Sequence, residues 1–92
     1  MDREIQLKKQ YFRAWHRGTR EADMLIGGYF DHHSKNWTSE DIIWFEKLLE
    51  CDDVDIMAWA IGTQSVPAKF EGRQMNMLQK LDYIDLPGKN SH

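Results

Sequence analysis

Hydrophobic residues recur at helical spacing along most of this chain. At 100° per residue, the apolar residues of segment 5–17 gather on one side of a helix; they are Leu7, Tyr11, Phe12, Ala14 and Trp15. Cations spaced four apart fall on the opposite side, namely Lys9, Arg13 and Arg17. The spacing therefore predicts a first helix with a buried apolar stripe and a solvated basic ridge.

A second helix is expected over residues 20–32. Gly18 is expected to stop the first helix, Thr19 can cap the second, and Glu21 is favourable in its first turn. The apolar face of this helix comprises Ala22, Leu25, Ile26, Tyr29 and Phe30. Another face carries Glu21, Met24, Gly28 and His32. Gly27 and Gly28 each cost about 1 kcal/mol relative to alanine, so they indicate close packing, a bare surface for a partner, or the end of the helix.

Residues 33–38 predict a polar loop, in which Trp37 is either an exposed interface anchor or folds back over the next helix. A third helix is expected over 39–50, since Thr38 or Ser39 can cap it and acids follow in its first turn. Asp52 and Asp53 are expected to cap a fourth helix that Gly62 ends.

Pro67 suits the first turn of a last helix, which Pro87 and Gly88 would terminate. Its apolar side would hold Phe70, Met77, Leu78, Leu81 and Ile84. No alternating strand pattern occurs. The prediction is an all-α fold, a single domain over residues 1–92 that forms one compact bundle of about five short helices, ordered from about residue 4 to 86.

Charge is distributed unevenly along the chain. The 92 residues carry a formal net charge of −3, which argues against general binding of nucleic acid. Residues 1–20 hold six Lys or Arg against two Asp or Glu, whereas residues 21–55 hold two against ten. Such polarity suits an oriented contact with another protein.

Candidate catalytic and metal-binding chemistry is sparse. Cys51 is the only cysteine, so an internal disulfide is impossible and a reducing compartment is expected. His32 and His33 are adjacent and would point in different directions on a helix, and no HxxxH, CxxC or HExxH spacing occurs. With no membrane-length apolar run and no signal or transit pattern, we expect a cytoplasmic protein of bacterial type with no metal and no stably bound cofactor.

The stretch from Arg17 to Glu21 leaves two interpretations open. Its residues are explained by helix capping and ordinary solvated charges, or they belong to a protein-binding site. Arginine can fork to a carboxylate or carbonyl of a partner, and glycine lets a partner's backbone approach closely. The candidate partner-binding residues are Arg13, Arg17, Gly18, Arg20, Glu21, Met24 and Gly28.

The Arg-Gly-x-x-Glu motif at residues 17–21, followed by Asp23, resembles the signature of the succinate dehydrogenase flavinylation factors, a family of small helical proteins. The resemblance continues through Phe-Glu-Lys-Leu-Leu-Glu-Cys-Asp-Asp at residues 45–53 to Asp55 and Trp59. It covers about residues 5–62. Thr19 and Ala22 depart from it, since many members carry a larger apolar residue and leucine at these positions.

The resemblance implies an assembly factor and not an enzyme. Family members bind the flavoprotein subunit of succinate dehydrogenase, and in bacteria also that of fumarate reductase. They promote a self-catalysed reaction that joins a histidine ring of that subunit to the 8α-methyl carbon of FAD. The resemblance implies that Arg17, Gly18 and Glu21 form the functional motif, and we expect a monomer that binds its partner transiently.

Two other functions fit the residues without the resemblance. One is a small helical interaction adaptor or nucleic-acid-associated regulator with no flavin role, against which the negative net charge counts. The other is a small enzyme or a protein that binds FAD directly, although the chain has no glycine-rich phosphate-binding motif.

Overall fold

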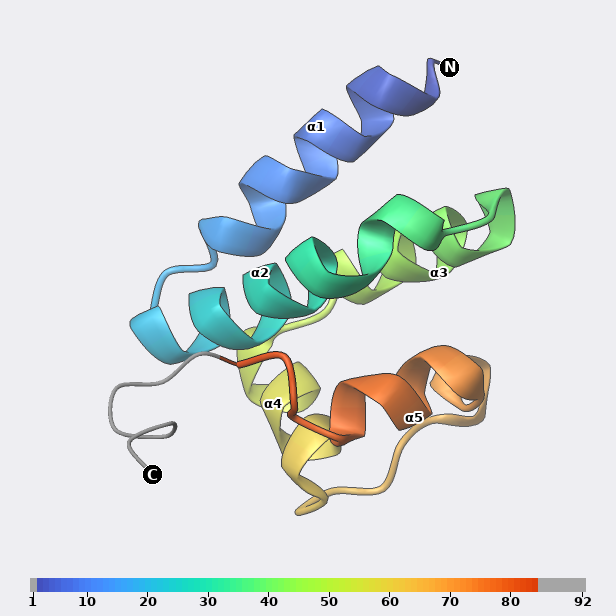
Figure 1. The fold of residues 1–92 in the computed structure, drawn as a ribbon. Coiled ribbons are helices and arrows are strands. Elements are labelled where there is room, and N and C mark those ends of the chain that lie inside the picture. The colour runs from blue at the N-terminus through green and yellow to red at the C-terminus, as the bar shows by residue number, and fades with distance from the viewer. Residues whose placement is uncertain (1, 85–92) are drawn as a thin grey trace.

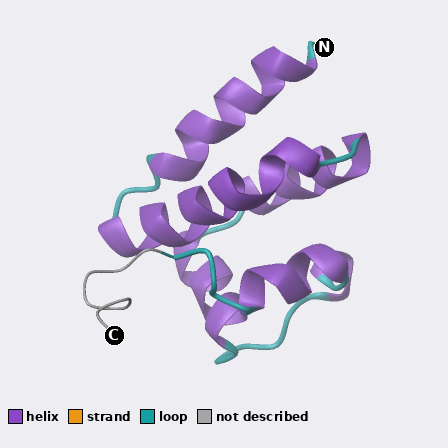
Figure 2. Cartoon of the chain, in the orientation of Figure 1, coloured by secondary structure: helices purple, strands orange, loops and turns teal. Residues whose placement is uncertain are grey.

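The computed structural model describes residues 2–84. Within this range the chain forms five α-helices and two short 3-10 helices (Figure 1). The elements are α1 (Arg3–Trp15), α2 (Arg20–His33), η1 (Ser34–Asn36), α3 (Ser39–Leu49), α4 (Asp53–Ile61), η2 (Ala68–Phe70) and α5 (Arg73–Gln79). Loops join them and no strand occurs among the described residues (Figure 2), so the all-α prediction is confirmed. The expected terminator at Pro87 and Gly88 lies outside the described residues.

Helix α2 is central to the bundle. Helix α1 packs on α2 and α3, whereas α4 contacts α2 and α5, so α1 and α5 lie on opposite sides of α2 (Figure 1). Seven residues of α2 are buried, and all are apolar or glycine; they are Ala22 and the six consecutive residues 25–30. The largest fully buried side chains include Tyr29, Phe45 and Phe70, which come from α2, α3 and η2.

Trp37 belongs to this core. Its side chain is only 4% exposed, and its ring packs against Phe30 and Phe45, with ring centroids 5.6 Å and 4.9 Å away. Of the two interpretations of Trp37, folding back over α3 is correct and the exposed anchor is wrong. The surrounding loop is also partly helical, because residues 34–36 form η1.

Three local capping signals are confirmed, whereas Asp52 stands at the N-cap of α4 without the predicted side-chain hydrogen bond. The Thr19 hydroxyl accepts a hydrogen bond from the backbone N–H of Ala22 at 3.2 Å. Thr38 caps α3 in a reciprocal capping box with Asp41. Gly62 ends α4 in the left-handed conformation with φ of 85°, where glycine avoids the Cβ clash of other residues. Each cap depends on residues close in sequence, which is why the sequence pattern suffices.

The predicted last helix is wrong at its start. Pro67 precedes the short η2, and α5 begins only at Arg73. Gly72 separates the two with φ of 138°, a backbone conformation outside any right-handed helix. Leu81 and Ile84 consequently lie beyond the end of α5. Phe70 belongs to η2 and is buried there.

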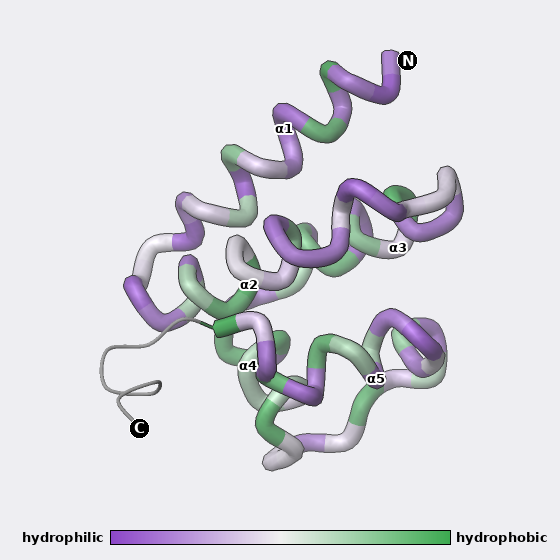
Figure 3. The backbone as a smooth tube through the Cα atoms, in the orientation of Figure 1, coloured by the Kyte–Doolittle hydropathy of each residue, from purple (hydrophilic) through white to green (hydrophobic). Residues whose placement is uncertain are grey.

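The predicted apolar stripe of α1 is also wrong in part. Tyr11 and Phe12 are exposed at 51% and 61%, whereas the fully buried residues are Ala14 and the polar Gln10. The Gln10 amide donates to the Ile42 carbonyl and to the Glu46 carboxylate, each at 3.0 Å. These bonds satisfy the buried amide nitrogen, while Gln10 Oε1 has no hydrogen-bond partner among the described residues. Helix α1 therefore faces the bundle with Gln10 and Ala14 and not with Tyr11 and Phe12. In Figure 3 the tube of α1 accordingly alternates between hydrophilic and hydrophobic colours.

None of the helices within residues 2–84 has the length and hydropathy that crossing a bilayer requires.

Candidate partner-binding site

The link between α1 and α2 is a short loop held by its own neighbours. Helix α1 ends at Trp15 with His16 as its cap. Gly18 lies beyond this cap, so the prediction that Gly18 stops the helix is wrong. Gly18 has φ of 122°, and no atom lies within 4 Å of the position that a Cβ would take. The backbone N–H of Arg17 donates to the Asp23 carboxylate at 2.6 Å. Glycine is therefore required by the backbone of this loop and not by packing around it.

The Arg17 side chain is directed into the protein. Its Nε donates to Asp53 Oδ1 at 2.7 Å, and its two terminal nitrogens donate to the carbonyls of Leu49 at 2.9 Å and Cys51 at 2.8 Å. The Arg17 side chain is only 11% exposed. A cation is favourable beside the carbonyls at the end of α3, and an anion is favourable in the first turn of α4. Arg17 thus ties the loop to the α3–α4 junction.

Arg13 is also paired within the chain. Its guanidinium binds the carboxylate of Glu46, and its second terminal nitrogen lies 2.7 Å from Glu50 Oε2. The prediction of a solvated ridge made of Lys9, Arg13 and Arg17 is therefore wrong for both arginines, since they face the acidic row of α3 and α4. Their predicted contact with a partner remains untested.

Arg20 and Glu21 are the free members of the motif. Both side chains are exposed, and neither makes a hydrogen bond or ion pair to any of the described residues. They follow the exposed Gly18 and Thr19 directly. The loop therefore presents one cation, one anion and a bare backbone to solvent on a support that Arg17 and Asp23 hold in place.

An open groove lies beside this loop. It has a volume of about 860 Å³. Its lining residues come from the end of α1, the loop and the start of α2; they are Trp15, His16, Gly18, Thr19, Arg20, Asp23 and Met24. The groove brings together three of the predicted site residues, Gly18, Arg20 and Met24. Glu21 lies outside its lining.

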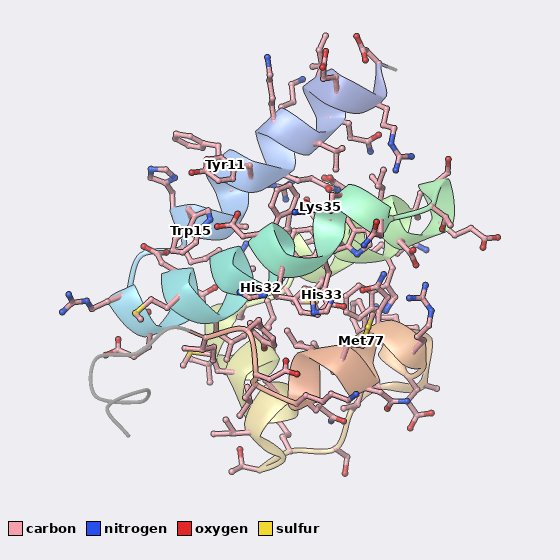
Figure 4. All side chains as sticks on the ribbon, viewed as in Figure 1. Tyr11, Trp15, His32, His33, Lys35 and Met77 are labelled. Carbon is pink, nitrogen blue, oxygen red and sulfur yellow. The ribbon has the colours of Figure 1, made fainter. Side chains whose placement is uncertain are left out.

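The Gly27–Gly28 pair is explained by close packing within the chain. A Cβ on Gly27 would lie 2.3 Å from a ring carbon of Trp15, and a Cβ on Gly28 would lie 3.3 Å from the backbone oxygen of Tyr83. Figure 4 shows Trp15 between α1 and α2. Because Gly28 is buried, close packing is the correct interpretation of the glycine pair, and a bare surface exposed at Gly28 is wrong. Gly28 instead lines a smaller pocket of about 290 Å³ together with Trp15, Met24 and Tyr83.

Histidine and cysteine side chains are placed apart. Within residues 2–84 no three His, Cys, Asp or Glu side chains group around a position for a metal ion. The rings of His32 and His33 have centroids 6.5 Å apart, and both lie on the side of α2 away from α1 (Figure 4). Burial raises the pKa of the Cys51 thiol, which disfavours the nucleophilic thiolate.

Sequence reasoning missed two residues that shape the site. Asp23 accepts the Arg17 amide, and Asp53 pairs with the Arg17 guanidinium. Asp53 was interpreted only as a helix cap, although its first-turn position in α4 does favour a carboxylate. Asp23 was noted only as the acid that follows the motif, two residues after Glu21, with no role assigned to it. No local pattern indicated that Arg17 would reach Asp53.

The structure has the features of a protein-binding module. It is a small helical bundle with a loop held by Arg17 and Asp23, the exposed charges of Arg20 and Glu21, and an open groove. The family model described as flavinator of succinate dehydrogenase matches residues 8–82. The chain belongs to this family, so the resemblance to the flavinylation factors is confirmed.

Curated relatives agree with this assignment. The FAD assembly factor SdhE of Acetobacter pasteurianus is 36% identical over 70 residues, which cover 76% of this chain and 62% of the relative. SdhE of Shewanella oneidensis is 35% identical over 54 residues, or 59% of this chain and 66% of the relative. Succinate dehydrogenase assembly factor 2-B, mitochondrial, of Drosophila erecta is 28% identical over 83 residues, or 86% and 53%. The chain thus spans less than two thirds of the length of these relatives. No solved structure matches it.

Proposed function

We propose that this chain is an assembly factor that binds the flavoprotein subunit of succinate dehydrogenase and promotes covalent attachment of FAD to it. The observation that carries the proposal is the family match over residues 8–82, which includes the motif at residues 17–21. The names of the bacterial relatives, FAD assembly factors, and of the Drosophila relative, a succinate dehydrogenase assembly factor, support the same role.

The geometry of the loop supports a division of labour within the motif. Gly18, Arg20 and Glu21 are accessible and contact the flavoprotein, whereas Arg17 positions them through its bonds to the α3–α4 junction. Holding the flavoprotein in one conformation would align its histidine with the 8α-methyl carbon of FAD, and alignment alone can supply a large part of a rate enhancement. The bond-forming chemistry stays within the flavoprotein.

This proposal has further parts. The chain acts as a monomer in the cytoplasm and binds no FAD stably, and the flavoprotein subunit of fumarate reductase is a second client. The open groove beside the loop fits a contact of modest size with a few anchors, which suits a complex that must later dissociate.

Covalent flavin in the flavoprotein subunit tests the role directly. The subunit is produced with and without this chain, denatured, separated by electrophoresis and examined for flavin fluorescence, which survives only when FAD is covalently bound. Deletion of the chain should reduce the fluorescence per subunit severalfold. Unchanged fluorescence after deletion would rule out the proposed function.

Glu21 offers a sharper version of this test. Glu21→Gln removes the free carboxylate and should lower the yield of covalent flavin about tenfold, the effect of losing one interface anchor. Glu40→Gln is the matched control, because Glu40 is likewise exposed in the first turn of a helix. Both variants should retain the helical circular dichroism of the parent chain. Equal yields from the two variants would contradict a role for Glu21 in binding.

A further inference from the structure

The side of α1 that faces away from the bundle combines two exposed large apolar side chains with two exposed lysines. Directly opposite the buried Gln10 and Ala14, helical spacing places five residues; they are Ile5, Lys8, Lys9, Phe12 and His16. Ile5 is 49% exposed and Phe12 is 61% exposed. We refer to these five residues as the outer face of α1, which lies along an edge of the molecule (Figure 1).

The outer face combines an apolar hollow with unpaired cations. Ile5 and Phe12, with Lys8, Lys9 and Arg13 around them, line a shallow hollow of about 410 Å³. Arg13 is held by Glu46 and Glu50. Lys8 and Lys9 are exposed and form no ion pair with the described residues. Their charge is therefore available to an anionic partner.

The Phe12 ring is held in place by a neighbour in the same chain, before any other protein binds. It stacks on the ring of His16 with centroids 4.0 Å apart and an interplanar angle of 15°. His16 Nδ1 in turn lies 2.7 Å from the backbone oxygen of Phe12. An aromatic side chain fixed before binding loses little conformational entropy in a complex, which is the property of an interface anchor.

The outer face continues into the candidate site. His16, which stacks on Phe12, also lines the groove that contains Gly18 and Arg20. Lys8 and Lys9 line the hollow and Arg20 lines the groove, and none of these cations forms an ion pair with the described residues. A partner that contacts the loop would meet the outer face next.

We propose that the outer face of α1 binds an acidic segment of the flavoprotein subunit, with an apolar side chain of that segment seated between Ile5 and Phe12. This inference rests on the proposed function. Charge complementarity to Lys8 and Lys9 determines the acidic character of the segment. A bilayer surface fits less well, because a helix that lies in a membrane interface buries a wide apolar face, whereas this face offers two large apolar side chains separated by lysines.

Affinity for the purified flavoprotein subunit tests the surface. Phe12→Gln should weaken binding about tenfold, whereas the control Ile61→Gln, which removes a 57% exposed side chain at the end of α4, should stay within about twofold of the parent. The double variant Lys8→Glu with Lys9→Glu should weaken binding similarly and flatten its dependence on salt. Lys35→Glu with Lys47→Glu carries the same change in charge at exposed positions elsewhere and should do neither.

The outcomes separate this surface from the proposed function. If the parent chain binds and raises covalent flavin while Phe12→Gln and the Lys8/Lys9 variant bind as tightly as their controls, the surface is wrong and the function stands. If the parent chain neither binds nor raises covalent flavin, both fail. Binding of the parent chain to vesicles containing anionic lipid, lost in the Lys8/Lys9 variant while flavoprotein binding is retained, would assign the face to membranes and overturn the inference.

Discussion

Arg17 shows how the motif combines support and recognition. Its guanidinium is nearly buried and satisfies two carbonyls and one carboxylate from the α3–α4 junction. The planar fork of arginine can reach all three acceptors at once, which a lysine ammonium on a flexible stem does less well. Gly18, which requires its positive φ, and the unpaired charges of Arg20 and Glu21 follow within four residues. One short segment therefore contains both the brace of the loop and its exposed contacts.

Truncation of Arg17 should destabilise the fold. Arg17→Ala leaves the Asp53 carboxylate and the carbonyls of Leu49 and Cys51 without their donor, so the free energy of unfolding should fall by about 2 kcal/mol. Arg20→Ala, which removes an exposed side chain three residues further along the chain, should change the free energy of unfolding by less than about 0.5 kcal/mol. Urea titration followed by circular dichroism measures both. Similar midpoints for the two variants would show that the bonds of Arg17 contribute little.

At the scale of elements, the sequence predicted where most helices begin but not how α1 faces its neighbours. Thr19, Thr38 and Gly62 act through residues a few positions away, so their patterns were sufficient. The orientation of α1 depends instead on Gln10, which bonds to α3 more than thirty residues away. Helical periodicity treats glutamine as a surface residue, and it therefore placed Phe12 inside.

The same limit applies to the candidate site. The Arg-Gly-x-x-Glu pattern identified the correct loop, and the structure finds Gly18, Arg20 and Glu21 exposed there. It could not indicate that Arg13 and Arg17 are engaged by α3 and α4, because the acidic partners are 33 or more residues away. Nor could it indicate that a Trp15 ring covers Gly27. Pairings across helices arise from the packed arrangement and leave no local signature.

The contact between α1 and α3 should depend on pH. Burial acts to raise the pKa of Glu46, but hydrogen bonds from Gln10 and Arg13 outweigh it and hold the pKa below its ordinary value. A carboxylate with a lowered pKa in the folded state stabilises the fold above its unfolded pKa and loses that contribution as the pH falls through its folded pKa. The stabilisation by Glu46 should thus be complete at pH 7 and disappear between about pH 5 and pH 3.

Glu46→Gln tests this contribution. At pH 7 the variant should unfold with up to about 1 kcal/mol less free energy than the parent, since the pair with Arg13 is partly exposed. The difference should shrink toward zero in urea titrations repeated down to pH 3. Glu71→Gln, at an exposed position with no partner among the described residues, is the control and should differ little from the parent throughout. A difference for Glu46→Gln that stays constant with pH would contradict the assignment.

At the scale of the whole molecule, the charge asymmetry of the sequence is larger than the charge asymmetry left on the surface. Arg13 and Arg17 from the basic first segment pair with Glu46, Glu50 and Asp53 from the acidic second segment. Much of the apparent polarity thus contributes to packing α1 on α3 and α4. Of the other cations in the first segment, Arg3 donates to the Trp37 carbonyl. Lys8 and Lys9 of α1 and Arg20 at the start of α2 form no ion pair with the described residues, so their charges are available to a partner.

The α4–α5 side of the molecule is joined to the rest through α2, and Tyr29 is a principal link. Its ring contacts Phe45 of α3 with centroids 6.2 Å apart. Its hydroxyl donates to the backbone carbonyl of Gln74 in α5 at 3.0 Å and contacts the amide of the same residue. Burial raises the pKa of Tyr29 well above its ordinary value, so the hydroxyl keeps the proton that it donates.

Tyr29→Phe removes this hydroxyl and keeps the ring. The buried polar groups of Gln74 then lose their partner, so the free energy of unfolding should fall by about 1–2 kcal/mol. Tyr11→Phe is the matched control, because the Tyr11 ring is half exposed and its hydroxyl has no partner among the described residues; it should change the free energy by less than about 0.5 kcal/mol. Coincident urea transitions by circular dichroism and tryptophan fluorescence would show that both sides still unfold together. Equal stability of the two variants would mean that the Tyr29 hydroxyl contributes little to holding α5, which Arg73 also ties to Asp41 of α3.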